Sequence, residues 1–103
     1  MSVTKISSPK IVRYAVVLNL SMEIPITEKY TTLSGVIGSF KRKRECTKIK
    51  NRKIELDYAI LLLEEAYILD GNLETIYMQK YNVNIVLSFP TKEIMERFEK
   101  SIV

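Results

Sequence analysis

Apolar and polar residues alternate along the first regular part of the chain. Every second residue from position 12 is apolar, and several residues between them are polar. The apolar set is Val12, Tyr14, Val16, Leu18, Leu20, Met22, Ile24 and Ile26, and the polar neighbours include Arg13, Asn19, Ser21 and Glu23. A period of two is typical of a strand with one buried face. Because Pro25 is tolerated only near a strand end or edge, we expect a strand over Val12–Glu23.

The next segment has apolar residues at helical spacing. They are Tyr30, Leu33, Val36, Ile37 and Phe40. Thr27 precedes them and is of a residue type that caps helices. We therefore expect a helix from Glu28 towards Phe40, in which Gly35 and Gly38 each cost about 1 kcal/mol relative to Ala.

The last segment predicts a second helix, from Lys92 to Ser101, which Pro90 and Thr91 introduce. Its apolar stripe consists of Ile94, Met95, Phe98 and Ile102. Glu93 with Arg97, and Glu96 with Lys100, are i,i+4 pairs in the favourable order.

The residues Asp70-Gly71-Asn72 indicate a tight turn between two apolar segments, and Gly-Asn suits a two-residue hairpin loop. A hairpin centred there would pair apolar residues on one face along its whole length. These pairs are Ile54 with Phe89, Leu56 with Leu87, Tyr58 with Ile85, Ile60 with Val83 and Leu62 with Tyr81. A register shifted by one residue would destroy this match.

The distal half of that hairpin would also be apolar on its second face. A bend of the tip, cover by the Tyr30–Phe40 helix, or a partner protein could each account for this face. The residues that we expect to bind a protein or peptide partner, including a second copy of the chain, are Leu61, Leu63, Tyr67, Ile76 and Met78. Edge pairing of the sheet would supply main-chain hydrogen bonds to such a partner.

These elements predict an α+β fold, with a small antiparallel sheet, a long β-hairpin and two helices. Residues 11–103 would form a single domain, and residues 1–10 a flexible N-terminal arm. The spacing Tyr14-x-Val16-x-Leu18 is similar to Tyr81-x-Val83-x-Ile85. A second interpretation therefore has two strand–helix repeats about a pseudo-twofold axis, with a groove between them.

Positive charge is concentrated in residues 41–53. This basic segment contains Lys41, Arg42, Lys43, Arg44, Lys48, Lys50, Arg52 and Lys53. Glu45 alone opposes them, so the segment carries +7 while the whole chain carries +4. We expect an exposed edge strand or loop here. Such a segment either contacts nucleic-acid phosphates or acts as a solvated connector.

Catalytic residue types are scarce. The chain has no histidine and one cysteine, Cys46, which excludes an internal disulfide and a multi-cysteine zinc site. No acidic residue is followed two places later by lysine, so the Asp/Glu-x-Lys signature of many metal-dependent nucleases is absent. We expect no enzymatic activity, no metal, no cofactor and no small-molecule substrate.

The composition has no Trp, few Gly, and many Ile, Lys and Tyr residues. In this it resembles small proteins of hyperthermophilic crenarchaeal viruses, a resemblance that covers no motif. No apolar run reaches the length of a membrane span, and the start lacks the apolar stretch of a signal peptide. We therefore expect no membrane partner and a cytoplasmic location, which the viral resemblance would make the host cytoplasm.

Overall fold

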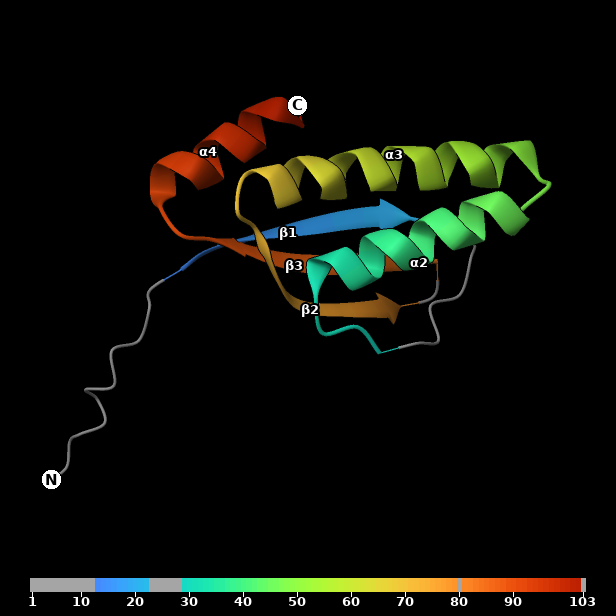
Figure 1. Ribbon diagram of the computed structural model, residues 1–103, viewed down its shortest axis with the longest axis horizontal. Coiled ribbons are helices and arrows are strands. Elements are labelled where there is room, and N and C mark those ends of the chain that lie inside the picture. Colours follow the sequence, from blue (N-terminus) through green and yellow to red (C-terminus); the bar gives the residue numbers. More distant parts are fainter. Residues whose placement is uncertain (1–12, 23–28, 80, 103) are drawn as a thin grey trace, which may run out of the picture.

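The computed structural model describes residues 13–22, 29–79 and 81–102, which form three strands and three helices. In chain order these are β1 (Tyr14–Ser21), α2 (Leu33–Cys46), α3 (Lys50–Ile68), β2 (Asn72–Gln79), β3 (Asn82–Phe89) and α4 (Lys92–Ser101) (Figure 1). The predicted α+β class is confirmed. Within these ranges, the helices all lack the combination of length and hydropathy that a bilayer crossing needs.

The three strands form one antiparallel sheet in the order β1-β3-β2, so the last strand of the sequence is central. Leu18 lies opposite Ile85, which in turn lies opposite Ile76 across the other ladder. The predicted strand is confirmed over Tyr14–Ser21, and its expected ends at Val12 and Glu23 lie outside the described residues.

All three helices cover one face of this sheet (Figure 1). The β3 residues on that face, Val83, Ile85, Leu87 and Phe89, are fully buried. The ring centroids of Phe89 and Phe98 are 5.0 Å apart. This aromatic contact packs α4 against the central strand β3. The predicted helix Lys92–Ser101 is confirmed, and its cap is Thr91, whose hydroxyl accepts the Ile94 N–H at 3.1 Å.

Helix α2 begins and ends later than the sequence predicted. Its cap is Thr32, whose hydroxyl accepts the Gly35 N–H at 3.1 Å, and the proposed cap Thr27 lies outside the described residues. Tyr30 precedes the helix and its hydroxyl bonds to that of Ser39 at 2.6 Å. The helix continues beyond Phe40 because Lys and Arg are good helix formers.

The predicted long hairpin is wrong, because residues 54–68 belong to α3. The Asp70-Gly71 signal ends that helix instead of joining two strands. Gly71 N–H donates to the Ala66 carbonyl at 2.8 Å, Asp70 N–H donates to the Tyr67 carbonyl at 3.2 Å, and Asp70 has φ 63°. This pattern is a Schellman motif. The observed hairpin joins β2 to β3, with Gln79 opposite Asn82.

Two further expectations change with this correction. The basic segment is not an edge strand or loop, because it forms the end of α2, the connector 47–49 and the start of α3. The pseudo-repeat is not confirmed. The strands β1 and β3 pair with each other. Two helices, α2 and α3, follow β1 along the chain, whereas one helix, α4, follows β3.

Candidate functional site

The outward-facing side of α3 is apolar. Four of its side chains, which we call the outer stripe, are between 51% and 74% exposed: Ile54, Tyr58, Leu61 and Ile68. Residues separated by four and seven positions lie on one side of a helix, so these four are aligned. The opposite side of α3 contributes the buried residues Leu56, Ala59, Ile60, Leu62, Leu63 and Ala66. This helix is therefore apolar on two sides, and only one of them is covered by the rest of the described protein.

The five residues predicted to bind a protein partner do not share one surface. Leu61 and Tyr67 are exposed on α3, but Leu63 is fully buried beneath the same helix. Ile76 and Met78 are half-buried on β2 and pack against the core. The apolar hairpin face that motivated this set does not exist, because the first half of the expected hairpin is helix α3 and the second half is the β2–β3 hairpin.

Three of the outer-stripe residues, Ile54, Tyr58 and Ile68, were not among the predicted binding residues. The sequence does contain a signal for them. With Leu61 they follow steps of four, three and seven residues, which is a helical spacing. This helical spacing did not stand out, because the buried side of α3 is also apolar. The resulting run of apolar residues is typical of a buried strand as well.

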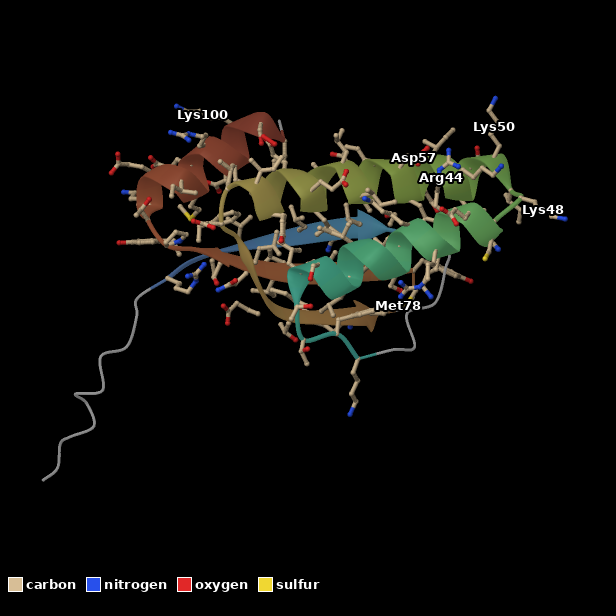
Figure 2. All side chains as sticks on the ribbon, viewed as in Figure 1. Arg44, Lys48, Lys50, Asp57, Met78 and Lys100 are labelled. Atoms are coloured by element: carbon tan, nitrogen blue, oxygen red, sulfur yellow. The ribbon has the colours of Figure 1, made fainter. Side chains whose placement is uncertain are left out.

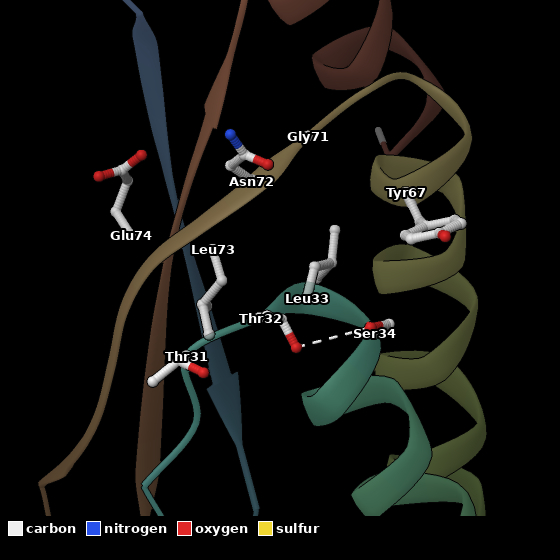
Figure 3. Close-up of a pocket in the computed structure, with 9 residues that line it drawn as sticks. All are labelled: Thr31, Thr32, Leu33, Ser34, Tyr67, Gly71, Asn72, Leu73 and Glu74. Atoms are coloured by element: carbon white, nitrogen blue, oxygen red, sulfur yellow. Dashed lines mark hydrogen bonds between the residues drawn. The ribbon is translucent and has the colours of Figure 1, made fainter.

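Tyr67 separates two shallow hollows beside α2. The first, of about 380 Å³, lies between Tyr67, the first residues of α2 and the start of β2, including Ser34 and Asn72 (Figure 3). The second, of about 300 Å³, lies between the two helices and reaches Lys41 and Glu64. The charged groups that line the hollows have partners: Glu74 accepts a hydrogen bond from Ser88, and Lys41 pairs with Glu64.

The basic segment forms the end of the antiparallel α2–α3 pair. Two of its cations bind acids of α3: Lys41 lies 2.8 Å from Glu64, and Arg44 Nε lies 2.7 Å from Asp57 Oδ1. The hydrogen bond from Arg44 lowers the pKa of Asp57, and the same bond raises the pKa of Arg44. Part of the positive charge therefore holds the helix pair together.

Three other cations of this segment, Arg42, Lys48 and Lys50, are exposed, and Lys53 is half-buried. Within the described residues, Arg42, Lys48, Lys50 and Lys53 lie within ion-pair distance of no carboxylate. Lys48 and Lys50 extend outward from the end of the helix pair, beyond the Arg44–Asp57 bridge (Figure 2). The first turn of α3 contains no acidic residue, so its backbone N–H groups add to the positive potential there. We call this region the basic tip.

The sheet face opposite the helices carries hydrogen bonds between polar side chains of different strands. Arg13 Nε donates to Ser88 Oγ at 2.8 Å, and Ser88 Oγ donates to Glu74 Oε2 at 2.5 Å. Asn19 Nδ2 donates to Asn84 Oδ1 at 3.0 Å. These bonds connect side chains of all three strands with Arg13, which directly precedes β1. Pairing of a peptide with the edge strands β1 or β2 stays a prediction.

The other residues considered for chemistry are dispersed. Cys46 is exposed at the end of α2. Glu55 and Asp57 lie on α3, whereas Glu74 lies on β2. Within the described ranges, His, Cys, Asp and Glu side chains nowhere gather in a group of three that could hold a metal ion.

Comparisons with family models, with curated proteins and with solved structures find no match to this chain.

Proposed function

We propose that this protein is a non-enzymatic protein-interaction module whose binding surface is the outer stripe of α3. The observation that carries this proposal is the exposure of Ile54, Tyr58, Leu61 and Ile68 on one side of a helix whose other side is already buried. A helix on the surface of a globular protein normally has one apolar side, which faces the core, and a polar side that faces solvent. The outer stripe therefore fits a surface that a partner covers.

The energetics favour such a partner. Burying a large aliphatic or aromatic side chain contributes roughly 1.5–3 kcal/mol relative to leaving it in water. Tyr58 also carries a hydroxyl that can hydrogen-bond at the edge of an interface, and tyrosine is enriched in protein interfaces. Four such side chains along one helix suit a partner helix that lies in contact with α3.

Site-specific photo-cross-linking tests this function. A benzophenone amino acid at position 61, in cells that contain the natural partners, should give a cross-linked product of discrete mass. The same group at Thr75 is the control, because Thr75 lies opposite Val86 on the sheet face away from the helices. The Ile68→Asp change should remove the product formed from position 61. If position 61 gives no product beyond that of position 75, the outer stripe is not a binding surface.

A second candidate function is nucleic-acid binding through the basic tip. It is favoured by the projection of Arg42, Lys48 and Lys50 into solvent at the end of the helix pair. Contacts of Arg42, Lys48, Lys50 and Lys53 with four phosphates of duplex DNA would give a slope of about −3 to −4 in a plot of log K against log salt. Lys48→Gln with Lys50→Gln should lessen the slope by about 2, while Lys92→Gln with Lys100→Gln on α4 should not change it. An affinity for DNA that does not change with salt concentration would exclude this function.

A further inference from the structure

The outer stripe follows the repeat of a coiled-coil helix. Positions 54, 58, 61, 65 and 68 are separated by alternating steps of four and three residues. Four of these five positions are apolar, and Glu65 occupies the fifth. A helix with this 3.5-residue repeat packs along a second helix that carries the same repeat. Helix α3 of another copy of this chain carries it.

We propose that the outer stripe binds the outer stripe of a second copy, with the two α3 helices antiparallel and crossing at Leu61. This inference rests on the proposed function and names the partner. A twofold axis at Leu61 places Leu61 beside Leu61 of the second copy. It also places Ile54 of each chain beside Ile68 of the other, so that the whole length of the stripe is covered.

Glu65, the polar residue of the repeat, selects the antiparallel arrangement. In a parallel pair in register, Glu65 would face Glu65 of the second copy, and two carboxylates in contact repel each other. In the antiparallel pair, Glu65 lies near Tyr58 of the second copy. The Tyr58 hydroxyl is then in position to donate a hydrogen bond to that carboxylate.

The charge distribution along α3 favours the same arrangement. Its first turn carries Lys50, Arg52 and Lys53, whereas Glu65 lies in its last turn and Asp70 follows directly after its C-terminal cap. Antiparallel packing brings the basic end of each helix near the acidic end of the other, whereas parallel packing would align two basic tips. Complementary ends of this kind set the orientation of helix pairs.

On the flank of the stripe that faces α2, the negative charges are already paired with cations of the same chain. Asp57 is paired with Arg44, and Glu64 with Lys41, each within the same chain. A second copy that approaches along this flank meets closed ion pairs and not isolated carboxylates. The cost of leaving a charge without a partner at an interface is thereby avoided.

The first experiment measures oligomeric state by light scattering coupled to size exclusion, over a range of protein concentrations. The wild-type chain should have twice the mass of one 12.0 kDa chain. Leu61→Asp should weaken the association by about tenfold or more, since it puts a charge at the centre of the interface. Tyr67→Asp is the matched control, because Tyr67 is similarly exposed on α3 but lies outside the stripe.

The second experiment measures orientation with a short bismaleimide cross-linker, after Cys46→Ser has removed the native thiol. L61C should cross-link with itself. I54C and I68C should cross-link with each other when the two proteins are mixed, but neither should do so alone. In the antiparallel pair, the two copies of residue 54 are about 21 Å apart along the helices.

The following results would contradict the proposed antiparallel dimer. A monomer at every concentration, or a dimer that Leu61→Asp leaves intact, excludes self-association through the stripe. Self-linking of I54C excludes the antiparallel arrangement. If the chain is a monomer and the photo-cross-linker at position 61 captures a different protein, the inference fails while the proposed function stands.

Discussion

Leu61 and Leu63 are two residues apart on α3, yet Leu61 is 65% exposed and Leu63 is fully buried. The two side chains point to opposite sides of the helix, one into solvent and one into the core beneath it. The same residue type therefore serves two purposes within a single helical turn. This pair offers a direct way to separate surface from core.

Replacing Leu63 by Ala should destabilise the fold by about 2–5 kcal/mol, because it leaves a cavity in the core. Replacing Leu61 by Ala should change the unfolding free energy of the isolated chain by no more than about 0.5 kcal/mol, as expected for an exposed site. Urea unfolding at low protein concentration measures both values. Equal losses for the two variants would mean that Leu61 is also part of the core.

The Asp57 carboxyl should titrate below its ordinary range, because Arg44 donates hydrogen bonds to it. The folded pKa lies below the unfolded value, so the contribution of this pair to stability is complete above the ordinary carboxyl pKa. It is lost as the pH falls through the folded pKa. An NMR titration of the Asp57 carboxyl carbon tests this expectation. Arg44→Gln should raise the pKa towards its usual value, while Arg42→Gln should leave it depressed.

Gly71→Ala should destabilise the protein by about 1–3 kcal/mol. An added Cβ would lie 2.8 Å from the Ala66 carbonyl oxygen and 2.9 Å from the Phe89 ring. Relief of that contact would disturb both the end of α3 and the central strand. Thermal unfolding measures the loss, and Gly38→Ala is the control, since its nearest neighbour is the end of the Arg42 side chain at 3.4 Å. If both glycines tolerate Ala equally, the close approach at Gly71 does not constrain the fold.

Thr32→Ala should cost about 0.5–2 kcal/mol, because it removes the side-chain acceptor for the Gly35 N–H. The exposed neighbour Thr31, which is not the cap, gives the matched control Thr31→Ala. Circular dichroism during urea unfolding would measure the difference. A larger effect from Thr31 than from Thr32 would place the start of α2 elsewhere.

The sequence predicted those elements whose pattern has one clear period. The alternation around Leu18 identified β1, and the single apolar stripe with its Thr91 cap identified both ends of α4. Helix α3 was missed because Leu61 and Leu63 are both apolar on opposite sides, so no helical period stands out. Its end was misread because Asp70-Gly71 suits a hairpin loop as well as a Schellman motif. The wrong hairpin then placed Met78 with Leu61 on one surface, although the core lies between them.

The central place of β3 in the sheet has a consequence for how the chain can fold during its synthesis. The two outer strands, β1 and β2, precede β3 in the sequence, and each pairs with β3 but not with the other. When the ribosome has made everything up to β2, the sheet therefore has no ladder at all. The helix pair α2–α3 can form early from contacts close in sequence. β1 must remain unpaired until the last strand emerges and joins both edges at once.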